Sequence, residues 1–183
     1  MLKRGFLRSR FVIIWIMTPE TEQTRLIDRL KEVNAACQEI IKEALHHPLP
    51  VAGNIAVFCQ SETEYEVFKQ VAESIANPSD NPAQKYLELK KPLVFSYKDT
   101  DSTYNFLYVR APAADSPEAG DVDFVLNQAE YTELKRRVSQ AGVAGASVYE
   151  RPGWDMVEIR NPRINALPYV CTQEMAEKVR VRF

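Results

Sequence analysis

The order strand, helix, strands occurs twice along this chain, and no other feature of the sequence restricts its fold as strongly. Apolar strand-like segments at 54–59 and 122–126 are each followed by a helical pattern and then by further strands. A half of this kind cannot cover its own sheet, so it must pair with its twin. The sequence therefore predicts one α+β domain built from two similar units.

In the first half, Ser61 and Glu64 form a capping box that opens the helix. Three strand-like segments are expected after the loop at 77–82, namely 86–89, 93–97 and 104–109. A segment with two prolines at 111–119 indicates a linker. In the second half, a helix is expected at 129–141 and strands at 146–150 and 155–159.

One long amphipathic helix is predicted from Thr18 to about Leu45, because its apolar residues recur every three or four positions. Before it, four cations precede the apolar run 11–17, which superficially resembles a signal peptide. A second interpretation takes Met17 as the start and 1–16 as a leader or disordered extension. The expected organisation is then an N-terminal helical segment at 17–50, a paired domain at 51–170 and a C-terminal tail at 171–183.

The composition and charge of the chain argue for a globular protein and against several classes of partner. Hydrophobic residues make up 45% of the 183, enough for one ordinary core, and the net charge is -2 with both signs scattered. We expect no nucleic-acid partner, and the run at 11–17 is too short to span a membrane. Three widely spaced cysteines, Cys37, Cys59 and Cys171, favour reduced thiols and a cytoplasmic protein. The sequence leaves both a monomer and a homodimer open.

Three segments resemble the vicinal-oxygen-chelate (glyoxalase/dioxygenase-like) superfamily. Asn54-Ile55-Ala56 and Asp121-Val122-Asp123 stand where the family opens with His-apolar-apolar, and 152–159 is similar to its closing hairpin. The layout is closest to the YecM-like branch. The resemblance implies two paired βαβββ modules that form a cupped mixed sheet, preceded by a long N-terminal helix.

The resemblance also implies a divalent-metal site, whose ligands by position are Asn54, Tyr108, Asp121 and Glu158. Two carboxylates and an amide suit a hard cation such as Mg, Mn or Ca rather than zinc. The cofactor expected from the resemblance is therefore a divalent metal (Mg, Mn or Fe), or none if the site is lost. Glu158 or Asp121 would move a proton. Two carboxylates in a cup without a cation repel each other and raise a pKa, so this arrangement requires a metal, a proton or a basic partner.

Arg110, Arg160 and Trp154 are candidates for binding a small-molecule ligand, although arginines beside strands are often solvated and strand aromatics often pack in the core. His46 and His47 stand where a helix ends, and capping is the simpler role for them than metal binding. No Ser/His/Asp or Cys/His arrangement and no Gly-rich phosphate loop can be argued from this sequence.

Two functions remain open. One is a divalent-metal-dependent enzyme of isomerase, lyase or dioxygenase type, acting on a small oxygen-chelating substrate. The other is a non-catalytic module on the same fold that has lost the metal site and binds a small ligand or a protein. An unrelated ferredoxin-like fold is the structural alternative, which would lack a pseudo-twofold relation between the halves.

Overall fold

The computed structural model describes residues 19–114 and 116–181, so the expected leader at 1–16 lies outside the described residues. The described chain begins with α1 (Pro19–Leu45), the long N-terminal helix that the sequence predicts. One stripe of α1 is buried against the sheet and carries Leu26, Leu30, Val33 and Ile41. None of the described helices is both long and apolar enough to cross a membrane.

The first unit contains β1 (Ala52–Phe58), α2 (Glu62–Ile75), β2 (Leu87–Tyr97) and β3 (Thr100–Arg110). Ser61 caps α2 through the backbone N–H of Glu64, as its sequence predicts. The two strands expected at 86–89 and 93–97 are instead one strand, β2, whose pairing with β3 shifts register between Glu88 and Leu93. Pro92 lies within this shift and has no N–H for the ladder.

The second unit contains β4 (Gly120–Leu126), α3 (Gln128–Ser139), β5 (Ala146–Arg151), β6 (Trp154–Ile159), β7 (Leu167–Thr172) and α4 (Gln173–Lys178). The sequence prediction was wrong for the region after Ile159, where it expected no strand and treated 171–183 as a tail. The structure places the strand β7 and the short helix α4 there. Pro168 made the run at 167–172 resemble a loop, yet β7 pairs with β4 on one side and β6 on the other.

All seven strands form one mixed sheet in the order β2-β3-β1-β4-β7-β6-β5. In each unit the first strand runs parallel to the last, as β1 does to β3 and β4 to β7. The units meet where β1 pairs antiparallel with β4. The α+β class, the mixed sheet and the long leading helix are thus confirmed, and the topology repeats with one strand fewer in the first unit.

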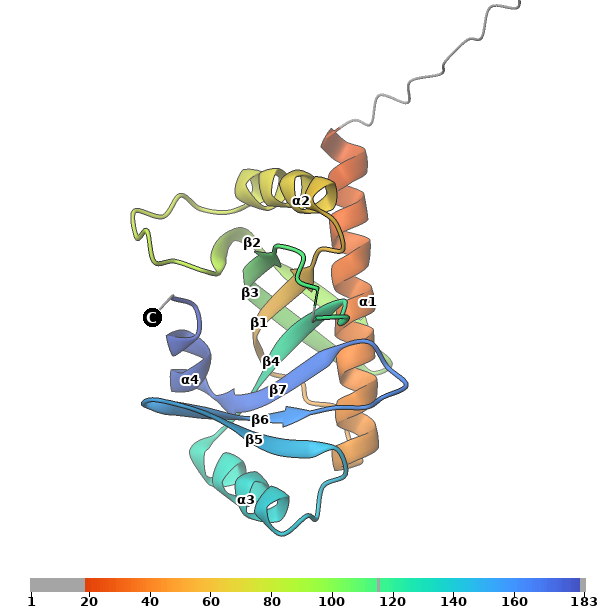
Figure 1. Cartoon of the computed structure of the whole chain (residues 1–183), viewed down its shortest axis with the longest axis vertical. Coiled ribbons are helices and arrows are strands. Elements are labelled where there is room, and N and C mark those ends of the chain that lie inside the picture. Colours follow the sequence, from red (N-terminus) through yellow and green to blue (C-terminus); the bar gives the residue numbers. More distant parts are fainter. Residues whose placement is uncertain (1–18, 115, 182–183) are drawn as a thin grey trace, which may run out of the picture.

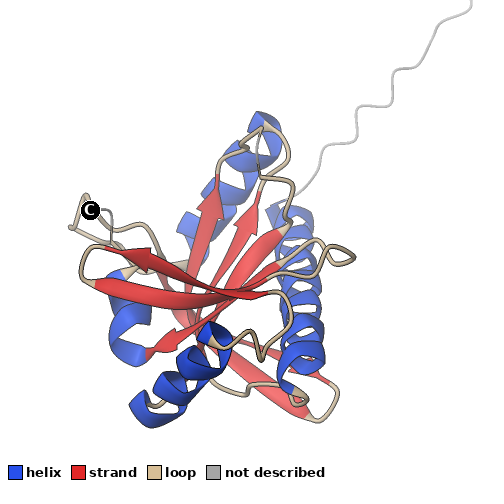
Figure 2. Cartoon of the chain, turned by 60° about the horizontal axis from the view of Figure 1, so that its bottom comes forward, coloured by secondary structure: helices blue, strands red, loops and turns tan. Residues whose placement is uncertain are grey.

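The two faces of the sheet differ in what covers them (Figures 1 and 2). Ile55, Val57, Val122 and Phe124 point into the main apolar core, which also includes buried side chains of α1, α2 and α3. Because successive strand residues point to opposite faces, the residues between them face the other way. We call that second face the cup face, and α4 packs against it through Ala176.

Candidate functional site

Polar side chains occupy the middle of the cup face, where β1 and β4 lie side by side. Asn54 of β1 pairs in register with Asp123 of β4, and Ala56 pairs with Asp121. Asp121 and Asp123 are two positions apart, so both carboxyl groups project from the same face. They line a cavity of about 210 Å³. Side chains from both units therefore form this cavity.

Aromatic side chains form much of the cavity wall. The ring of Tyr149 lies with its centroid 6.0 Å from that of Trp154 and 6.2 Å from that of Tyr169, both in tilted geometry. Phe58 and Tyr86 line the opposite side, which the first unit contributes. The cavity thus combines aromatic side chains from both units with two acidic groups.

Asp123 is 2% exposed and is bound by a network that reaches the C-terminal segment. Its Oδ2 accepts a hydrogen bond of 2.6 Å from Asn54 Nδ2, which also donates to the Ala176 carbonyl oxygen at 2.9 Å. Arg180 Nε in turn donates to Asn54 Oδ1 at 2.8 Å. Burial raises the pKa of Asp123 to about 6, although the hydrogen bond from Asn54 opposes the change.

Asp121 is 9% exposed, and its Oδ1 has no hydrogen-bond partner among the described residues. Burial, followed by the nearby charge of Asp123, raises the pKa of Asp121 to about 8. The charges of Lys85 and Arg110 and a hydrogen bond with Tyr86 act in the opposite direction but do not outweigh burial. Burial and mutual repulsion thus oppose ionisation of both carboxyl groups at once, so the pair titrates as a coupled unit.

Two cations line the same cavity. The Lys85 ammonium lies 4.8 Å from the ring centroid of Tyr108 and 5.3 Å from that of Tyr86. The Arg110 guanidinium lies 4.5 Å from the ring centroid of Phe58. Among the contacts of the described residues, aromatic rings hold both charges and neither takes part in a salt bridge. Both remain available to a negatively charged group in the cavity.

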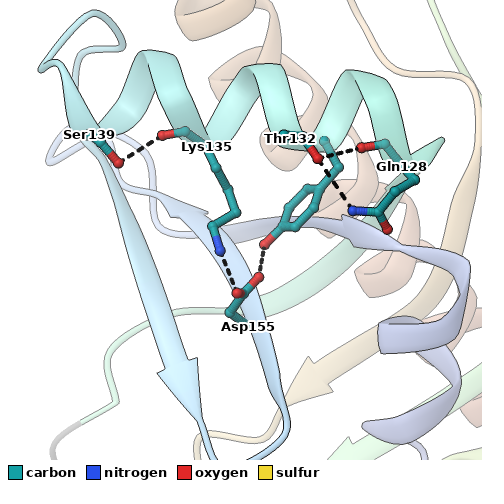
Figure 3. Close-up of polar contacts among 6 residues, drawn as sticks. Gln128, Thr132, Lys135, Ser139 and Asp155 are labelled. Atoms are coloured by element: carbon teal, nitrogen blue, oxygen red, sulfur yellow. Dashed lines mark hydrogen bonds and ion pairs between the residues drawn. The ribbon is translucent and has the colours of Figure 1, made fainter.

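Asp155, a half-buried acid on β6, is paired directly with side chains of α3 (Figure 3). Asp155 of β6 accepts hydrogen bonds from the Tyr131 hydroxyl and, at 2.5 Å, from Lys135 Nζ, both on α3. Burial alone would raise the pKa of Asp155, but these contacts outweigh it and the pKa is lowered. Asp155 thus anchors α3 on the helix-covered face, whereas Asp121 has no comparable ion pair.

All four residues of the proposed metal set lie on the cup face, but only Asp121 lines the cavity. Tyr108 packs against Tyr86 with ring centroids 5.3 Å apart. Glu158 lies on β6 rather than on the last strand, and its Oε1 is 2.5 Å from Arg160 Nε. Asn54 is held through both of its polar side-chain atoms by the Asp123 network.

These contacts do not fit a four-ligand metal centre, because Asn54 and Glu158 would first have to leave their present partners. The described residues also contain no group of three or more His, Cys, Asp and Glu side chains placed to hold a metal ion. Metal binding by these four residues therefore stays a prediction.

Among the predicted ligand-binding residues, Arg110 and Trp154 line the cavity, whereas Arg160 does not. Arg160 bridges two acids instead, with its Nη1 2.7 Å from Glu118 Oε1 and its Nε beside Glu158. His46 ends α1 with a left-handed φ of 71°, and its N–H donates to the Lys42 carbonyl oxygen. Ligand binding by Arg110 and Trp154 is a prediction that the geometry permits.

Sequence reasoning missed Asp123, Lys85 and Tyr169. Asp123 could have been found, because Asp121 and Asp123 alternate with the apolar Val122 and Phe124 and so must share a face. Tyr169 lies on β7, which was not predicted because Pro168 weakens the strand pattern of this segment. Lys85 lies in the segment before β2, where no local pattern indicates which way its side chain points.

The fold and the cup define an α+β protein of two paired units around a cavity of small-molecule size. Among known proteins, no family model and no curated protein matches this chain. One similar solved structure is titled "Structural Genomics, Protein EC4020", with a TM-score of 0.57, 14% identity, and coverage of 91% of this chain and 98% of that one. That likeness shows a shared fold.

Another solved structure is a glyoxalase/bleomycin resistance protein/dioxygenase superfamily member from Vibrio splendidus 12B01. Its TM-score is 0.33 at 11% identity, over 64% of this chain and 95% of that one.

Proposed function

We propose that this chain is a glyoxalase/dioxygenase-like protein, in layout of the YecM-like branch, whose cup binds a small molecule without requiring a metal. The observation that carries the proposal is the Asp121 carboxyl group, which lines the cavity while its Oδ1 has no partner in the described chain. A buried polar atom without a partner costs about 1–3 kcal/mol. A ligand that hydrogen-bonds to this atom would remove that cost.

The size of the cavity suits a small ligand. Its volume of about 210 Å³ exceeds the roughly 150 Å³ at which an apolar cavity can accept a benzene molecule. The aromatic wall offers contacts to a flat apolar body, and the polar groups of Asp121, Lys85 and Arg110 would orient it. The cavity thus offers aromatic contacts together with polar groups that would fix the orientation of a ligand.

A protonated Asp121 would supply the chemistry of this proposed site. A carboxyl group with a raised pKa can donate a hydrogen bond to a ligand oxygen, and the same proton is the one that a general acid would transfer. The neighbouring Asp123 would stabilise the site in either protonation state through its bond to Asn54. The chain's own residues therefore suffice for recognition and for holding one proton.

A screen of small molecules tests this proposal. Uniformly ¹⁵N-labelled protein would be mixed with fragments that carry carboxylate, carbonyl, hydroxyl or amine groups, and shifts would be mapped onto the cup. We expect hits that shift the Trp154 indole N–H and that weaken in Asp121→Leu but not in Asp101→Asn, which changes an exposed acid. Hits that bind equally to both variants, or only outside the cup, would refute a binding site at Asp121.

A metal-dependent isomerase, lyase or dioxygenase is the second candidate function, since an unpartnered carboxylate oxygen is also a potential metal ligand. It requires Asn54 and Glu158 to exchange their partners. Elemental analysis after incubation with Mn²⁺, Fe²⁺ or Mg²⁺ separates the two candidates. Stoichiometric metal that Glu158→Ala loses would favour the enzyme, and no bound metal would favour the metal-free site.

A further inference from the structure

The acidic groups of the cup face are shielded from solvent in this structure. Asp123 is 2% exposed and Asp121 is 9% exposed, and the unpartnered Oδ1 of Asp121 is itself buried. A ligand from solution therefore needs a movement of the protein to reach that oxygen. Most of the cavity wall is the sheet, but Val179 of the wall belongs to the C-terminal segment. We call residues 173–181, which contain α4 and Val179, the C-terminal strap.

The C-terminal strap joins the two units across the cup face, and Figure 1 shows it on the side of the sheet away from α1. In the second unit, Lys178 Nζ donates to the Gly153 carbonyl oxygen at 3.2 Å, in the turn between β5 and β6. At the first unit, the Arg180 carbonyl oxygen accepts hydrogen bonds from the N–H of Lys85 at 2.7 Å and of Tyr86 at 3.1 Å. Lys85 and Tyr86 line the cavity, so the strap is attached at its rim.

Few apolar side chains hold the C-terminal strap in place. Among residues 173–181 only Ala176 is buried, while Met175, Val179 and Val181 are half-buried. Segments with few buried apolar contacts open locally at a lower free energy than the core strands do. The preceding strand, β7, is paired on both sides and would stay in the sheet. The strap is therefore the part of the wall that can move without disrupting the fold.

Arg180 holds the strap with its side chain as well as with its backbone. Its guanidinium lies 3.6 Å from the ring centroid of Phe106, and its Nε donates to Asn54 Oδ1 at 2.8 Å. Asn54 in turn donates to Asp123 and to the Ala176 carbonyl oxygen. One residue thus connects the strap to the polar centre of the cup.

Resting on the proposed function, we infer that the C-terminal strap is a gate over the cup, with Arg180 as its latch. The strap opens to admit a small molecule and closes over it. Closure returns Asp121 and Asp123 to a cavity that holds little water, where a hydrogen bond to a ligand is stronger than in solution. Opening breaks the contacts of Arg180 and leaves the strand pairing of the sheet unchanged.

A native cysteine reports on this gate. Cys171 is 0% exposed and packs on the cup face with Ala176 of the strap. Cys37 is also 0% exposed, but it belongs to the main core on the other face. Alkylation by iodoacetamide, followed by mass spectrometry of the peptides, should modify Cys171 roughly tenfold faster than Cys37, or more. Equal rates would mean that the strap opens only when the whole protein unfolds, and would overturn the gate.

Arg180→Ala tests the latch. It should speed alkylation of Cys171 about tenfold, as expected for the loss of one charge-assisted hydrogen bond, and leave Cys37 unchanged. Arg136→Ala is the control, because Arg136 is exposed on α3 and pairs with Glu133 of the same helix. An unchanged Cys171 rate in Arg180→Ala, or an equal acceleration of Cys37, would contradict the latch.

A disulfide that closes the gate tests its link to binding. Gln84 and Val181 face each other in an antiparallel bridge, where Cα atoms lie roughly 4.5–5.5 Å apart and a disulfide can form. Benzamide, a neutral ring with a donor and an acceptor, is the probe, and stopped-flow fluorescence of Trp154 in a Trp15→Phe background is the readout. Oxidised Gln84→Cys/Val181→Cys should bind benzamide roughly tenfold more slowly than the reduced form, or not at all.

The outcomes separate the gate from the proposed function. Equal benzamide rates in the oxidised and reduced double variant would overturn the gate and leave the small-molecule site in place. If neither benzamide nor any fragment of the screen changes the Trp154 signal, although Cys171 reacts ahead of Cys37, the binding function is refuted and the moving strap stands.

Discussion

Asp121, which is buried, and Asp155, which is half-buried, show how burial and immediate neighbours together shift the pKa of an acid. Lys135 and Tyr131 hydrogen-bond directly to Asp155 and lower its pKa, despite burial. Lys85 and Arg110 act on Asp121 only through space, so burial and Asp123 prevail and its pKa rises to about 8. Asp155 thus anchors α3 on one face of the sheet, whereas burial raises the pKa of Asp121 on the other.

The raised pKa of Asp121 makes stability depend on pH. Its pKa in the folded chain, about 8, lies above the ordinary value of 3.8, so between these values the folded state binds more protons than the unfolded state. The contribution of Asp121 to the free energy of unfolding is therefore fully present below about pH 4. This contribution declines as the pH rises toward 8. One pKa unit corresponds to about 1.4 kcal/mol, so the decline is of the order of a few kcal/mol.

We expect Asp121→Asn to remove the decline in the free energy of unfolding above about pH 6. The decline below about pH 6, which arises from the raised pKa of Asp123, should remain. Urea unfolding of both proteins at about pH 6 and pH 8.5 measures this, with Asp101→Asn as the exposed control. Equal declines in wild type and Asp121→Asn would show that Asp121 is ionised in the folded state at pH 6.

Some of the residues that line the cavity were named as candidate site residues from the sequence. Asp121, Arg110 and Trp154 were named from strand patterns and the family resemblance, and all three line the cavity. Glu158 was misassigned to a final strand because β7 was not recognised, and its carboxylate pairs with Arg160. Which buried acid keeps its proton depends on groups distant in sequence, such as Lys85, and no local pattern encodes that.

At the scale of elements, the close approach of β4 to its neighbours holds the two units together. A Cβ on Gly120 would lie 2.2 Å from the Ala56 carbonyl oxygen on β1 and 2.8 Å from a Val33 methyl on α1. The first neighbour is backbone and cannot move away cheaply. Gly120 therefore lets β1, β4 and α1 meet at the centre of the fold.

We expect Gly120→Ala to destabilise the protein by more than about 2 kcal/mol, because overpacking at a backbone contact forces strands apart. Gly153→Ala is the control, since its Cβ would meet nothing within 4 Å and costs only a left-handed backbone, about 1–2 kcal/mol. Urea midpoints measure both. A smaller loss for Gly120→Ala than for Gly153→Ala would contradict the close packing of β4.

Elements with a clear periodicity were predictable, and the others were not. The repeating apolar positions of α1 and the N-cap Ser61 of α2 placed both helices correctly, although Glu64 accepts from the Gln60 N–H and so does not complete a capping box with Ser61. β7 and α4 were missed, because a proline inside a short apolar run and a helix of six residues give weak local signals. Tertiary pairing with β4 and β6 stabilises β7 despite Pro168.

At the scale of the whole molecule, one sheet and one core run through both units. The main apolar cluster includes residues of α1, α2 and α3 as well as strands of both halves. Neither unit covers its own sheet, so we expect a single cooperative unfolding transition. Circular dichroism and the fluorescence of Trp154, in a Trp15→Phe background, should give the same urea midpoint. Two separate midpoints would mean that the units unfold independently.

The account depends on a carboxyl pair at the centre of the cup that keeps a proton near neutral pH. Carboxyl ¹³C signals of the aspartates, followed by NMR from about pH 4 to pH 10, measure this directly. We predict that the pair titrates in two steps, with the upper one near pH 8, and that Asp121→Asn abolishes the upper step. Titration of both carboxyl groups below about pH 5 would contradict the account.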